Sequence, residues 1–134
     1  MINAERLLDT FLRYVQIDSE SGHEKVMGET LVRDVKALGL DPITDKVGET
    51  FGSDGFNVFF CFPGTLPGDP FVLSAHMDTV VPGKGIRPFI EDGIIKSGPD
   101  TILGGDDKSG ICGILEAITT ILEKGLPHRT AEVV

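Results

Sequence analysis

The sequence predicts an α/β fold in which helices pack on a mixed, mostly parallel sheet. Two observations support this class. Apolar residues recur every three to four positions in three segments, and short continuous apolar runs lie between these segments. The first pattern is typical of helices with one buried face, and the second is typical of buried strands. The 134 residues have the length of one domain, and no linker divides them.

Three segments carry the helical pattern. The first covers residues 4–16, the second follows a predicted capping box at residues 21–24, and the third covers residues 108–124. In the capping box, the Ser21 hydroxyl and the Glu24 carboxylate would each cover a free backbone amide. Gly39 is expected to end the second helix.

The predicted strands lie between the second and third helices and after the third. Residues 57–62 and 70–75 are apolar runs bounded by Pro and Gly, and we expect strands buried on both faces. Residues 89–91 and 94–96 flank an Asp-Gly pair, which is a strong hairpin signal. Residues 130–134 have the pattern of a further strand that is cut in the middle.

Composition and charge exclude several function classes. The net charge of -9 disfavours nucleic acid and anionic membranes as partners. No segment approaches the roughly 20 apolar residues that span a bilayer. The charged N-terminus does not resemble a signal peptide, so we expect a cytoplasmic protein. Cys61 and Cys112 lie far apart, and we expect two small buried side chains rather than a disulfide or a thiolate metal site.

The first group of candidate site residues follows the apolar run at residues 71–73. His76 would lie at the C-terminal end of a buried strand, where α/β sheets bind ligands. Asp78 could accept a hydrogen bond from one imidazole nitrogen and leave the other nitrogen free for a metal. A lone His after a strand is more often a core or surface group. His23 and His128 are expected to be surface residues.

The second group lies in a glycine-rich loop that becomes the third helix. Asp106 and Asp107 are adjacent carboxylates, which repel one another unless a cation compensates them. The alternative is a helix cap with a favourable dipole interaction. Lys108 and Ser109 also resemble the end of a phosphate-binding loop, but the two carboxylates before them would repel phosphate. Each group alone is a weak or moderate signal, whereas both in this order are a strong one.

These motifs together resemble the M20 metallopeptidases, and within them the peptidase T-like (tripeptide aminopeptidase-like) branch. The resemblance is carried by residues 76–80, 82–86, 92–93 and 102–110. It implies that residues 1–134 are the N-terminal portion of a single zinc-exopeptidase-like catalytic domain. The rest of that domain and a separate dimerisation domain would then lie further on, and the parent protein would be a homodimer.

The resemblance also implies a role for each site residue. His76 is similar to a terminal zinc ligand, and Asp106 to the ligand that bridges two zinc ions. Asp78 is similar to the catalytic residue that orients His76. The peptide bond between Asp106 and Asp107 is typically cis in this family, and Asp107 carries no metal role. Cobalt or manganese could replace zinc.

The activity that the resemblance implies is hydrolysis of short peptides. The general base would be a Glu from an adjacent Glu-Glu pair beyond the last predicted strand, and Glu132 does not fit this role. We therefore expect the isolated chain to be inactive and to hold zinc weakly or not at all. The substrate could be a tripeptide, a dipeptide or an acyl amino acid. The alternative is a non-catalytic fragment that self-associates or binds a partner through an open sheet edge.

Overall fold

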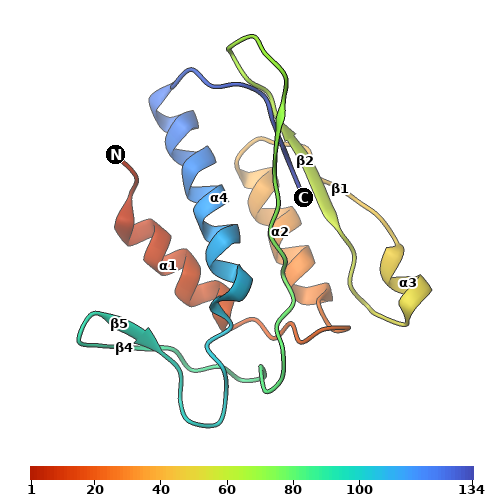
Figure 1. Cartoon of the computed structure of the whole chain (residues 1–134), viewed down its shortest axis with the longest axis vertical. Helices are drawn as coiled ribbons and strands as arrows, with labels where there is room; N and C mark the ends of the chain where they lie inside the picture. Colours follow the sequence, from red (N-terminus) through yellow and green to blue (C-terminus); the bar gives the residue numbers. More distant parts are fainter.

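A computed structural model describes all residues from 1 to 134 and confirms the α/β class (Figure 1). The helices are α1 (Ala4–Val15), α2 (Lys25–Ala37), α3 (Val47–Phe51) and α4 (Gly105–Lys124). The strands are β1 (Ile43–Thr44), β2 (Val58–Phe62), β3 (Phe71–Leu73), β4 (Phe89–Glu91), β5 (Ile94–Lys96) and β6 (Ala131–Val133). None of the helices is long and apolar enough to cross a membrane.

The main sheet is mixed, as predicted, and has the strand order β1-β2-β6-β3. The expectation that it is mostly parallel is wrong, because β6 pairs in parallel only with β3, whereas the β1–β2 and β2–β6 pairs are antiparallel. The parallel pair follows from the long connection through α4, which brings the chain back to start β6 beside β3. The chain reverses direction between β2 and β3, so β6 lies between two strands of opposite direction.

The sheet is covered well on one face only. Along β2 the side chains of Val58, Phe60 and Phe62 are buried, whereas Cys61 between them is exposed. In β3 both Phe71 and Val72 are exposed. The predicted burial on both faces is therefore wrong for these strands. An apolar run does not reveal how many of its faces are covered.

The core lies between the covered face of the sheet and helices α1, α2 and α4. Its members share near-complete burial and come from all three helices and from two central strands. They are Tyr14, Met27, Leu31, Val35, Phe60, Phe62, Ile111, Cys112, Leu115, Ile118, Ala131 and Val133. Cys112 is buried as expected, and this burial raises the pKa of its thiol to about 12. The expected burial of Cys61 is wrong, because its side chain lies on the open face of the sheet.

The predicted capping box before α2 is wrong. The N-cap residue is Glu24, and its side chain makes no capping hydrogen bond within the helix. The Glu24 carboxylate instead accepts from the backbone N–H of Gly22 at 2.6 Å and from the Ser53 hydroxyl at 2.9 Å. The Ser21 hydroxyl donates to the Asp78 carboxylate, so a residue with the signature of a local cap makes a long-range contact.

The predicted hairpin is confirmed and forms a separate two-stranded sheet, away from the main sheet (Figure 1). Asp92 and Gly93 at its tip have φ angles of 51° and 76°, which explains why this pair marks the turn. Helix α3 and strand β1 were not predicted. They are short, and neither has a period that sequence reasoning can detect.

Two glycines of α4 provide a matched pair for testing how this helix begins. A Cβ added at Gly113 meets no atom within 4 Å, so Gly113→Ala is expected to stabilise the fold by about 0.5–1 kcal/mol. A Cβ at Gly110 would lie 2.7 Å from the carboxyl carbon of Asp107, which caps the helix. Gly110→Ala is expected to lack that gain, because displacing a cap costs about 1 kcal/mol. Urea unfolding of both variants measures the difference, and equal stabilisation would contradict the assigned cap.

Candidate metal site

The two predicted groups of site residues meet in the structure. His76 lies in the loop that follows β3, and Asp106 lies in the first turn of α4. Although 30 residues separate them, His76 Nε2 lies 3.2 Å from Asp106 Oδ1. The predicted proximity of these two side chains is therefore confirmed. Their roles as metal ligands stay a prediction.

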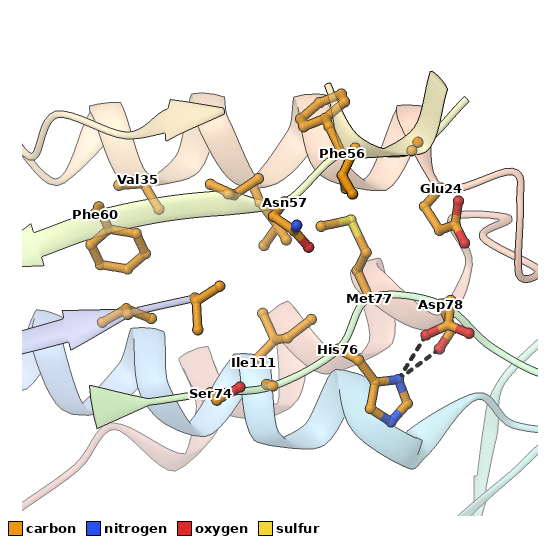
Figure 2. A pocket seen from close by; sticks show the side chains of 18 of the residues that line it. Glu24, Val35, Phe56, Asn57, Phe60, Ser74, His76, Met77, Asp78 and Ile111 are labelled. Carbon is orange, nitrogen blue, oxygen red and sulfur yellow. Dashed lines mark hydrogen bonds and ion pairs between the residues drawn. The ribbon is translucent and has the colours of Figure 1, made fainter. Parts of the chain in front are cut away.

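Asp78 contacts the other nitrogen of the same imidazole (Figure 2). His76 Nδ1 lies 3.1 Å from Asp78 Oδ1 and 3.1 Å from the Asp78 carbonyl oxygen. Partial burial by itself would lower the pKa of His76, but the backbone and carboxylate oxygens of Asp78 and the carboxylate of Asp106 outweigh it. The pKa of His76 is raised as a result. With a proton on Nδ1, Nε2 is the nitrogen that can bind a metal.

The two adjacent carboxylates of the second group have different partners. Asp107 Oδ1 accepts from the backbone N–H of Gly110 at 3.1 Å, so this residue caps the regular part of α4. Asp106 is 96% exposed in its side chain and contacts His76. The peptide bond between them is cis, as predicted. The cap interpretation thus fits Asp107, which contacts Gly110, and the metal-ligand interpretation fits Asp106, which contacts His76.

Lys108 follows this pair and is fully buried. Its Nζ donates to the carbonyl oxygen of Ile17 at 2.6 Å. Burial lowers the pKa of its ammonium group to about 8, and the nearby Asp18 only partly opposes this effect. An ammonium group that is bound to a backbone carbonyl inside the protein cannot reach a phosphate. The geometry therefore agrees with the rejection of a phosphate-binding loop.

Residues 17–21, here called the bracing segment, connect α1 to the loop before α2 and contact both groups of site residues. Ser19 and Ser21 exchange backbone hydrogen bonds with Thr79, at 2.8 and 3.0 Å. The Ser19 hydroxyl donates to the carbonyl oxygen of Met77 at 2.8 Å. At the other end, Ile17 accepts from Lys108. Sequence reasoning missed this segment because it has no motif of its own.

His76 and Asp106 fit part of a zinc site. Two ligands of a tetrahedral zinc ion, with bonds of about 2.1 Å, lie about 3.4 Å apart, close to the 3.2 Å between Nε2 and Oδ1. A catalytic zinc ion usually has about three protein ligands. In residues 1–134, no group of three or more His, Cys, Asp or Glu side chains is arranged so that it could hold a metal ion.

A cavity of about 360 Å³ opens beside His76 and Asp78 (Figure 2). His76 and Asp78 line it together with mostly apolar side chains from α2, β2, α4 and the end of β6. Leu31, Phe60 and Ile111 are among the apolar members. The candidate ligand His76 therefore borders a largely apolar space.

The other two histidines lie elsewhere. His23 is exposed before α2, as expected. The His128 ring stacks on Phe62, with 4.2 Å between the ring centroids, and its nitrogens contact the carbonyl oxygens of Leu126 and Pro63. It is half-buried and holds the turn before β6, which is a structural role.

The chain is similar to known peptidases in sequence and fold. A tripeptidase structure from Staphylococcus aureus superposes on 99% of this chain with a TM-score of 0.95 and 40% identity. An aminopeptidase PepT structure from Bacillus cereus covers 98% with a TM-score of 0.94 and 41% identity. An uncharacterised Bacillus subtilis protein, YqjE, is 40% identical over the whole chain. No family model matches the chain.

The chain thus has a peptidase-type α/β fold with a paired His and Asp beside a cavity. More narrowly, it is a homologue of part of the peptidase T-like proteins, as its motifs predicted. The chain spans 36% of the length of each of the three proteins named above.

Proposed function

We propose that a polypeptide of the relatives' length containing this chain, here called the full-length protein, hydrolyses short peptides with the help of bound zinc. The observation that carries this proposal is the line of contacts from Asp78 through the His76 ring to Asp106. In this line of contacts, His76 Nε2 and the exposed Asp106 carboxylate lie at a distance from each other that suits two ligands of one ion. The related tripeptidase and aminopeptidase support the reaction class.

In this proposal each residue of the chain has a separate task. His76 would hold a metal ion through Nε2, Asp106 would hold it through its carboxylate, and Asp78 holds the His76 ring in place from Nδ1. Bound zinc would supply a Lewis acid for the scissile carbonyl and a water molecule of lowered pKa. The general base and the remaining ligands come from residues of the full-length protein outside this chain. The apolar cavity beside His76 is suited to apolar side chains of a peptide.

The test is hydrolysis of tripeptides by the purified full-length protein. Activity is expected to disappear on treatment with a chelator and to return with zinc, cobalt or manganese. The 134-residue chain alone is expected to be inactive and to bind zinc weakly in calorimetry, because it contributes only two candidate ligands. Chelator-resistant activity of the full-length protein would contradict the proposal. Robust turnover or tight stoichiometric zinc binding by the chain alone would show that the ligands are misassigned.

One observation favours a second function, which is association through the sheet edge. Phe71 and Val72 of the edge strand β3 are 39% and 64% exposed, and an exposed apolar edge favours pairing with another strand. Sedimentation of the chain distinguishes the two functions. A stable dimer that Val72→Lys dissociates, together with a full-length protein that has no peptidase activity, would favour association.

A further inference from the structure

Ser21 links the bracing segment to the candidate metal site. Its hydroxyl donates to Asp78 Oδ2 at 2.5 Å, while the other oxygen of the same carboxylate, Oδ1, lies 3.1 Å from His76 Nδ1. The second acceptor within reach, the carbonyl oxygen of Thr79, is farther away at 3.4 Å. The contacts therefore run in one line from Ser21 through Asp78 and His76 to Asp106.

The backbone around Ser21 is held independently of its side chain. Ser21 N–H donates to the Thr79 carbonyl, and Thr79 N–H donates to the Ser19 carbonyl. Farther along the loop, Glu20 Oε1 accepts from the N–H of Gly83 at 2.7 Å, and Asp18 Oδ1 accepts from the N–H of Gly85 at 2.8 Å. Since none of these contacts uses the Ser21 hydroxyl, we expect them to remain when it is removed, so its contribution can be measured without loss of the segment.

We propose that Ser21 is a positioning residue of the site, whose hydroxyl fixes the rotation of the Asp78 carboxylate and thereby the orientation of the His76 ring. A carboxylate rotates easily about its last bond unless both oxygens have partners. Of the two carboxylate oxygens of Asp78, Oδ1 contacts the imidazole beside the Asp78 carbonyl oxygen, and Ser21 holds the other, Oδ2. The expected effect of Ser21 on catalysis rests on the proposed function. Its effect on the orientation of the His76 ring does not, because that orientation can be measured without any reaction.

The first test uses the chain itself and needs no metal. The chain has three histidines, so the nitrogen NMR signals of His76 can be assigned with a His76→Gln variant. At alkaline pH, where the ring is neutral, the form with the proton on Nδ1 is expected to dominate in the wild type. Ser21→Ala is expected to shift the ring toward a mixture of both tautomers, while Ser21→Thr restores the wild-type spectrum. A wild-type spectrum in Ser21→Ala would overturn the proposal.

The second test uses the full-length protein and measures zinc affinity and peptide turnover. Ser21→Ala is expected to weaken zinc binding and lower kcat by about 3–10-fold, which corresponds to the loss of one hydrogen bond, with little change in KM. Ser21→Thr is expected to retain both. Ser97→Ala is the matched control, because its hydroxyl donates to Thr101 in the loop after β5, outside the line of contacts.

The possible failures of the two proposals are distinct. If the wild type has no metal-dependent activity, the proposed function fails, and the tautomer measurement still decides the role of Ser21. If the wild type is active and Ser21→Ala binds zinc and turns over peptide as the wild type does, the positioning role is wrong. Equal defects in Ser21→Ala and Ser21→Thr, with a lowered Tm, would indicate a purely structural residue.

Discussion

Replacement of His76 by alanine in the full-length protein is expected to reduce peptide hydrolysis by more than about 100-fold, beyond the usual effect of losing a partner that only orients a ligand. The reason is that Nε2 is the only imidazole nitrogen close to Asp106, so no other histidine of this chain can replace it. Initial rates with a tripeptide, with zinc content measured in the same samples, would check this expectation. The loss of activity should accompany a loss of bound zinc.

Two further variants make the His76 result specific. Asp78→Ala is expected to lower activity by about 10–100-fold, because it removes the group that orients the ligand rather than the ligand itself. His23→Ala is the matched control, since this histidine is exposed and lies outside the site. Unchanged activity in His76→Ala would refute the site, and an equal loss in His23→Ala would mean that the effect is not local.

The second large effect concerns stability. Glu116 in α4 has a side chain that is only 4% exposed, and its carboxylate accepts from Arg6 Nε at 2.7 Å and from the N–H of Asn3 at 2.7 Å. Thr120 donates to it as well, at 2.9 Å. Glu116→Gln is expected to destabilise the fold by about 1.5–3 kcal/mol, because it removes charge-assisted hydrogen bonds that join the start of α1 to α4. Urea unfolding at neutral pH measures the change.

The same carboxylate should make stability depend on pH. The guanidinium of Arg6, which opposes the effect of burial, lowers the pKa of Glu116 to about 2, with help from the Asn3 amide and Thr120. A carboxyl group whose pKa is lower in the folded state than in the unfolded state stabilises the fold fully above its unfolded pKa, which is about 4.5 for Glu116. This contribution is lost as the pH falls from about 4.5 toward 2. Glu116→Gln is expected to flatten the stability profile in that window.

Glu123 provides the control for this prediction, because it contacts the same arginine from the surface. Its carboxylate lies 2.5 Å from Arg6 Nη1, but its side chain is 52% exposed. Exposed ion pairs contribute about 0–1 kcal/mol, so Glu123→Gln should have a much smaller effect than Glu116→Gln. Equal losses of stability in the two variants would show that the burial of Glu116 does not strengthen its contacts with Arg6.

The elements with clear periodicity could be predicted from the sequence. The stripes of α1, α2 and α4 and the Asp-Gly pair at residues 92–93 led to elements at nearly the observed positions. The direction of strand pairing could not be predicted, because β6 lies between β2 and β3 and this placement depends on the whole chain. Strand β1 and helix α3 are too short to show a period.

The candidate site was predictable only in part. The proximity of His76 and Asp106 followed from the order of two motifs, and the structure confirms it. The family resemblance assigned the ligand role to Asp106 and none to Asp107, but the two identical neighbours carry no signal of their own that Asp107 is the one that caps the helix. Ser21 has the local signature of a cap, and only the tertiary structure shows that its hydroxyl bonds to Asp78 instead.

The detached hairpin has a consequence for how this chain could be altered. The strands β4 and β5 lie between the two motifs in sequence but pair only with each other among the strands, whereas His76 and Asp106 are held by β3, α4 and the bracing segment. Asp92 and Gly93 at the tip are exposed, and such tips tolerate insertions. The number of residues between the motifs is therefore free to differ among homologues. For the same reason, this tip is the natural point to attach an epitope tag or a fluorescent label.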